Sequence, residues 1–193
     1  MQKQRGVRFI DLLVNDIEKN LIDTEYLIVD DVEYFKEKVK DVILNEYKVD
    51  KELEEEAERI LQQNSDEIMY RGIPFFKARK LIKEKLAKEK GLPSPGSIFT
   101  REKANYIASK ILRFILTDDE IDYTVEKGVV RQQIVKAFNN IAQVKKDVDM
   151  VAREKIDSMS KPIPEGTPEW SALYRRFYEE ELISRGLIDS EDS

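Results

Sequence analysis

The residue types that could carry chemistry are limited, because the 193 residues include no histidine and no cysteine. Serine–histidine catalysis, histidine-ligated zinc, disulfides and cysteine nucleophiles are therefore excluded. Any catalysis would rest on Asp, Glu, Lys, Tyr or Ser, and no side chain that naturally titrates near neutrality is present. No nucleophile–base pair or phosphate-binding loop is visible. We predict no catalytic residues, no metal ligands and no cofactors, and hence a protein that is not an enzyme.

An acidic cluster with alternating carboxylates runs through Asp118-Asp119-Glu120 to Asp122. It lacks the glycine and the terminal glutamate of a calcium-binding loop. We interpret it as negative charge at the start of a helix, with Thr117 and Glu120 at the spacing of a capping box.

The strongest electrostatic feature is a basic segment, residues 71–90, whose eight cationic and two acidic residues give a charge of +6. Residues 49–67 carry the opposite charge, −6. A short break separates them, so we expect an antiparallel hairpin in which the acidic helix cancels much of the positive field. The candidate interaction residues on the basic helix are Arg79, Lys80, Lys83 and Lys88.

A second candidate surface lies near the C-terminus. Thr167 is a good N-cap, Pro168 suits the first helical position, and Gly186 is a stop signal, which together predict a helix over about 168–185. Aromatic and aliphatic residues recur along it at three- and four-residue spacing, from Trp170 onward. Such a stripe is usually core, so we expect it to be buried. Interaction residues at its rim would be Tyr174, Arg175, Arg176 and Tyr178.

The elements that position these residues are helices, because apolar residues recur with helical periodicity along the chain. Asp50 and Asp147 are interpreted as caps that open new helices, and Thr100 as the cap of another. No run alternates with a two-residue period, so we expect no sheet. The expected helices span about residues 7–22, 30–47, 50–70, 74–91, 100–115, 125–141, 147–159 and 168–185.

The sequence also predicts an internal duplication. Gly72 and Pro74 recur as Gly166 and Pro168 at an offset of 94, and other positions recur at 94–96. A segment rich in Pro, Gly and Ser lies between the two copies. We therefore predict an all-α protein of two tandem helical domains of about four helices each, over residues 1–92 and 100–193, with a linker at 93–99.

The second half resembles an uncharacterised bacterial family, the domain of unknown function 507 family. The most specific match is Glu165-Gly166-Thr167-Pro168-Glu169-Trp170 with the helix that follows it. Arg101-Glu102-Lys103-Ala104 and Ala152-Arg153-Glu154-Lys155-Ile156 also match. The first half looks like a diverged copy, with Phe75-Phe76 where Glu-Trp would stand. The resemblance implies no known activity.

Composition sets the remaining expectations. Hydrophobic residues make up 41% and charged residues 37%, which is typical of a globular protein. No membrane span or signal peptide is visible, so we expect a cytoplasmic protein, and the heavy use of Lys and Glu favours a thermophilic source. We predict a non-catalytic interaction or adaptor protein that contacts other proteins. The alternative is a nucleic-acid-associated protein that uses the basic helix of residues 74–90, although the net charge of −6 opposes strong binding to polyanions.

Overall fold

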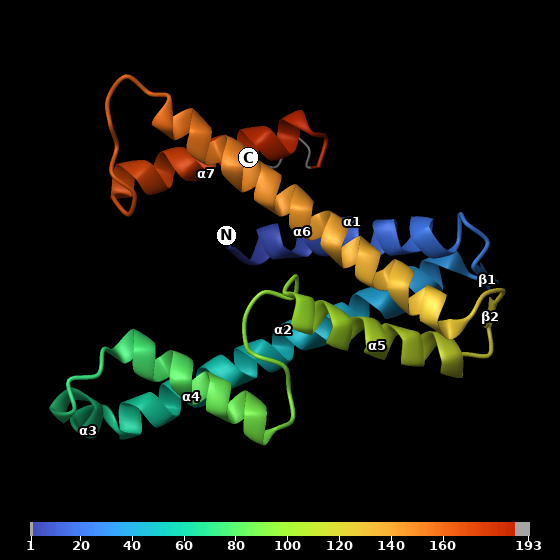
Figure 1. Cartoon of the computed structure of the whole chain (residues 1–193), viewed down its shortest axis with the longest axis horizontal. Helices are drawn as coiled ribbons and strands as arrows, with labels where there is room; N and C mark the ends of the chain where they lie inside the picture. The colour runs from blue at the N-terminus through green and yellow to red at the C-terminus, as the bar shows by residue number, and fades with distance from the viewer. Residues whose placement is uncertain (1, 188–193) are drawn as a thin grey trace. The chain divides into compact units, whose positions relative to one another are not determined.

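Figure 1 shows a computed structural model of the chain, in which residues 2–187 are described, with side chains from Phe9 onward. The predicted all-α class is confirmed, since the described residues form seven helices and two short strands. The helices are α1 (Gln2–Leu21), α2 (Val32–Gln63), α3 (Ser65–Tyr70), α4 (Phe75–Glu89), α5 (Arg101–Thr117), α6 (Lys127–Asp157) and α7 (Pro168–Ser184).

The chain packs as two compact units. The first combines the N-terminal segment up to Asp16 with the chain from Lys136 onward, and so holds most of α6 and all of α7. The second runs from Ile17 to Val135 and holds α2 to α5. These units are defined by packing, and the predicted domains at 1–92 and 100–193 stay a prediction about the sequence.

The expectation of no sheet is wrong in one small respect. Two strands of three residues, β1 (Leu27–Val29) and β2 (Ile121–Tyr123), pair antiparallel in the second unit. Leu27 lies opposite Tyr123, and Ile28 lies opposite Asp122. Strands this short, paired over a long sequence separation, leave no alternating pattern for sequence analysis to detect.

The acidic cluster belongs to this region and not to a helix start, which corrects the sequence interpretation. Asp118 is the C-cap of α5, and its carboxylate accepts hydrogen bonds from the Tyr34 hydroxyl at 2.9 Å and from the Glu120 amide at 3.0 Å. Asp122 lies in β2. The cluster therefore shapes the turn that leads from α5 into the strand.

Two long helices replace four predicted shorter ones. α2 runs without a break past Asp50, and α6 runs past Asp147. Neither aspartate caps a helix, because each carboxylate is engaged elsewhere: Asp50 pairs with Lys103, and Asp147 accepts a hydrogen bond from Gln143 at 2.7 Å. No glycine or proline is present at either position to force a break.

The strongest local signals were read correctly. Thr100 and Thr167 both cap helices, accepting hydrogen bonds from the amides of Lys103 and Trp170. α7 begins at Pro168 as predicted. At the other ends, Gly72, Gly91 and Gly186 each adopt a φ of about +65° after α3, α4 and α7. The residue after each glycine donates its amide to the carbonyl five residues back, which is the Schellman arrangement.

Buried polar contacts join α2 to α5 in the second unit. Lys103 is 2% exposed, and its ammonium donates to the Asp50 carboxylate and the Gly96 carbonyl. Glu46, 3% exposed, pairs with Lys110. Because a buried charge without a partner is costly, these pairs fix how the two helices align.

Candidate interaction surface

The predicted hairpin forms between α2 and α4. Leu53 and Ala57 of α2 pack against Leu86 and Ala87 of α4, and a second cluster brings Leu61 beside Ala78. α3 lies at the far end of this hairpin (Figure 1). We call this end of the hairpin, from α3 to the first turn of α4, the tip.

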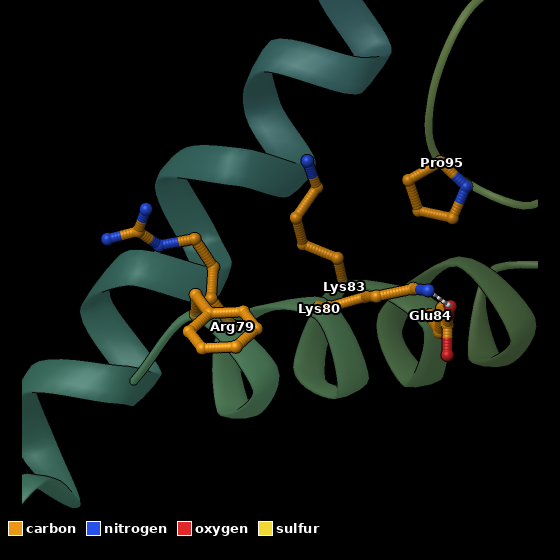
Figure 2. A pocket seen from close by; sticks show the side chains of 6 residues that line it. Arg79, Lys80, Lys83, Glu84 and Pro95 are labelled. Atoms are coloured by element: carbon orange, nitrogen blue, oxygen red, sulfur yellow. Dashed lines mark ion pairs between the residues drawn. The ribbon is translucent and has the colours of Figure 1, made fainter. Parts of the chain in front are cut away.

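The predicted basic residues on α4 divide into two groups. Arg79 reaches Glu58 at 2.8 Å, and Lys83 pairs with Glu54, so both point toward α2, as Figure 2 shows. Lys80 instead lies along α4, with Glu84 at 3.9 Å. Lys88 is exposed and has no ion pair with any described residue. The acidic helix thus neutralises the cations that face it and leaves those on the outer face available.

Large apolar side chains are exposed at the tip, and sequence analysis did not assign them to a site. Tyr70 is 92% exposed, Phe76 69% and Met69 65%. Ile73 and Phe75 complete what we call the tip patch, and Leu81 extends it along α4 at 60% exposure. Phe76 and Leu81 lie outside the apolar stripe that α4 buries. This departure from helical periodicity is the one sequence signal that could have predicted their exposure.

A small hollow adjoins the tip patch (Figure 2). It has a volume of about 170 Å³ and is lined by Phe76, Arg79, Lys80, Lys83, Glu84 and Pro95. Sites for drug-sized ligands occupy roughly 300–1,000 Å³. The hollow is therefore better suited to one side chain of a larger partner.

The aromatic helix α7 packs on α6 in the first unit, and its stripe is less buried than expected. Trp170, Tyr174 and Tyr178 are half-buried, and Leu182 is the one fully buried residue recorded for this helix. The Trp170 and Tyr174 rings stack with centroids 5.0 Å apart. The expectation of a buried core stripe is therefore wrong for these aromatic residues.

A polar network around Arg153 orders these rings. The guanidinium lies 5.2 Å from the Trp170 centroid and donates to the carboxylates of Asp149 and Glu165, at 3.1 and 2.8 Å. The Tyr174 hydroxyl donates to Asp149 at 2.5 Å. Burial and this hydrogen bond raise the pKa of the Tyr174 phenol above its ordinary value. Arg153 and Glu165 belong to two separate motifs of the resemblance, and the fold brings them together.

The other candidates on α7 lie around this network. Arg175 is exposed. Arg176 pairs with Glu180 at 3.1 Å and lies 4.8 Å from the Phe177 centroid. The Tyr178 ring lies 5.6 Å from that of Tyr174. These contacts form within the α6–α7 pair, so we read this surface as mainly structural.

The described part of the chain contains neither a candidate metal site nor a membrane-spanning helix. No group of three or more acidic side chains there could hold a metal ion. No helix within residues 2–187 combines the length and the apolar character needed to cross a membrane.

Comparison with known proteins gives one result. Residues 6–187 match the family model described as "Protein of unknown function (DUF507)". No curated protein matches the chain. The family match covers both predicted halves, including the tip patch and the Arg153 network. The chain therefore belongs to the DUF507 family of proteins of unknown function.

Proposed function

We propose that this protein is a non-catalytic interaction module that binds a partner protein through the tip patch. The observation that carries the proposal is the exposure of Tyr70 and Phe76 together with Met69, Ile73 and Phe75 at one end of a hairpin. Contiguous exposed apolar surface is uncommon on monomeric proteins and marks interaction sites. Aromatic residues and methionine are also the types enriched at protein interfaces.

The support beneath the patch favours a docking role. Ile68 of α3 is buried against Leu61 and Ala78, so the exposed rings are carried by packed helices. The turn between α3 and α4 is closed by hydrogen bonds from Gly72 to Met69 and from Ile73 to Ile68. A surface that is ordered before binding loses less conformational entropy when a partner arrives.

The test begins with affinity capture by the full chain and by a Tyr70→Ser/Phe76→Ser variant. A captured protein is then purified and titrated by calorimetry against both forms. We expect binding that the variant loses. The matched control is Met150→Ser, which removes a side chain 48% exposed on α6 and should bind like the parent. A purified partner that binds the parent and the tip variant equally would contradict the proposal.

A nucleic-acid-associated role for α4 is the alternative. Lys77 and Lys88 favour it, since neither has an ion pair with a described residue. The pairs of Arg79 and Lys83 with α2 oppose it, because they remove cations that a phosphate backbone would need. With the interaction-module proposal we also propose a cytoplasmic location in a thermophilic bacterium, inferred from composition and resemblance.

A further inference from the structure

The chain is basic through the tip patch, and the acidic residues Glu67 and Glu84 lie at the two ends of this stretch. From Ile68 to Lys83 the sequence contains five cationic residues and no acidic residue. Arg79 and Lys83 are engaged with α2, which leaves Arg71, Lys77 and Lys80 around the exposed rings. The partners of Arg71 and Lys80 are exposed carboxylates one helical turn away, at 2.5 and 3.9 Å. Such pairs contribute only a few tenths of a kcal/mol, so a partner's carboxylate can replace them.

The outer face of α4 combines this charge with apolar anchors. Phe76 and Leu81 are exposed on it, separated by about 7.5 Å along the helix axis. Five residues also rotate the side chain by about 140° around the helix, so Phe76 and Leu81 project from opposite edges of the exposed face, and an opposing helix would contact both by lying between them. Lys77, Lys80 and Lys88 are exposed on the same helix. A helix laid along α4 would therefore meet apolar contacts at the two edges of this face and positive charge between them.

The charge of the whole molecule limits what can approach. The chain carries a net charge of −6, and the part of α2 that packs on α4 belongs to the −6 segment of residues 49–67. An extended polyanion or an anionic membrane would face that negative surface as well as the cations. A short segment covers only the basic and apolar area and avoids the repulsion.

We infer that the partner presents an acidic amphipathic helix, which lies along the outer face of α4 with apolar residues on Phe76 and Leu81 and carboxylates on Lys77 and Lys80. One apolar side chain of that helix enters the hollow beside Phe76 and Pro95. This is the helix-in-groove mode of recognition. The inference rests on the proposed function and adds the chemistry of the partner.

The probe is a displayed library of helical peptides in which acidic, basic and neutral residues are equally frequent. The full-length protein selects from it, and the selected peptides are measured by fluorescence anisotropy. We expect selection for Asp and Glu beside apolar residues at i, i+3, i+4 and i+7. Lys77→Glu/Lys80→Glu and Tyr70→Ser/Phe76→Ser should each weaken binding at least about tenfold. The matched controls are Lys146→Glu and Met150→Ser, exposed positions on α6 that should leave binding unchanged.

The outcomes separate the inference from the proposed function. Selected peptides that are neutral or basic, but still lost in the Tyr70→Ser/Phe76→Ser variant, would overturn the acidic partner and leave the tip as a docking surface. Peptides insensitive to both tip variants would overturn both ideas. Vesicles of phosphatidylcholine with phosphatidylglycerol, and single-stranded DNA, are titrated in parallel. Tip-dependent binding to either one at physiological salt, with no peptide selected, would also overturn both.

Discussion

The half-buried ring of Trp170 should contribute less to the free energy of unfolding than a fully buried aromatic ring. Tyr174 stacks on the Trp170 ring, and Arg153 lies above it. Because part of the ring already faces water, we expect Trp170→Ala to lower the free energy of unfolding by about 1–2 kcal/mol. Phe35→Ala, at a site with no exposure, should cost about 3–5 kcal/mol. Denaturant unfolding of both variants tests the contrast, and equal losses would show that Trp170 is core.

Tyr174 provides a pH-dependent test of the Arg153 network. Burial and the hydrogen bond to Asp149 raise the pKa of its phenol, so folding favours the neutral form. Its contribution to stability is complete below the unfolded pKa of about 10 and is lost as the pH rises through the folded value. In an absorbance titration of tyrosinate, Asp149→Asn should lower this pKa, with Tyr174→Phe identifying the signal. An unchanged titration in Asp149→Asn would mean that the hydrogen bond is absent in solution.

At the scale of elements, the ion pairs between α2 and α4 have a measurable consequence. Glu54 lies near both Lys83 and Arg79, so Glu54→Lys replaces two attractive pairs by repulsion. These side chains are partly exposed, and we expect a loss of about 1 kcal/mol that shrinks at high salt. Glu54→Lys/Lys83→Glu should recover part of it. Glu52→Lys, an exposed position on the same helix without an ion pair to a described residue, should change little.

The elements that sequence could predict are those with local signals. Thr167, Pro168 and Gly186 define α7 because cap, first residue and stop each depend on neighbouring backbone. The helix breaks predicted at Asp50 and Asp147 are wrong, because each side chain, although able to cap a helix, bonds another side chain instead. Pairing of Asp50 with Lys103 spans 53 residues, and no local pattern indicates it.

The candidate site was predicted in part. Charge patterning identified the basic helix and its acidic neighbour, because the net charge of a segment is counted directly from the sequence and requires no knowledge of tertiary contacts. The tip patch was missed because apolar residues are assigned to cores by default, and exposure of Tyr70 depends on how α3 ends against α4. The same default led to the prediction that Trp170 is buried, whereas its ring is half-buried.

For the whole molecule, several contacts favour the predicted duplication, which stays a prediction. At an offset of 94, Ile28 corresponds to Asp122, and these two residues face each other in the centre of the strand pair, as a pseudo-two-fold axis would require. At the same offset, the hydrogen bond between Asp16 and Asn140 corresponds to the ion pair between Lys110 and Glu46. The first helix of each half thus contacts the long helix of the other half.

This exchange predicts how fragments behave. Separated halves, 1–92 and 100–193, would leave Lys103 without Asp50 and Glu46 without Lys110. We expect the two fragments to associate on mixing, with a gain in far-UV helical signal over the sum of the separate spectra. Lys103→Glu in the second fragment should weaken the association. Fragments that fold fully alone and remain apart in a mixture would contradict the exchange.

The last prediction concerns the electrostatic field of the molecule and its response to nucleic acid. The +6 segment could attract phosphates, but Arg79, Lys83 and Lys90 pair with acidic residues of α2 and the net charge is −6. We therefore expect only weak binding to DNA and RNA oligomers. It should vanish near physiological salt, since few counterions would be released.

Fluorescence anisotropy from low to physiological salt measures this binding, with Lys80, Lys83 and Lys88 changed to Glu in the test variant. Lys83→Glu alone would also break the pair with Glu54, so its unfolding free energy must be measured beside its binding. The single variant Lys88→Glu avoids that problem, because Lys88 has no ion pair with a described residue. If submicromolar binding persists at physiological salt and Lys88→Glu weakens it without loss of stability, α4 is a nucleic-acid surface. That result would contradict the proposal of a partner protein as the main ligand, because the outer face of α4 cannot bind a partner helix and nucleic acid at the same time.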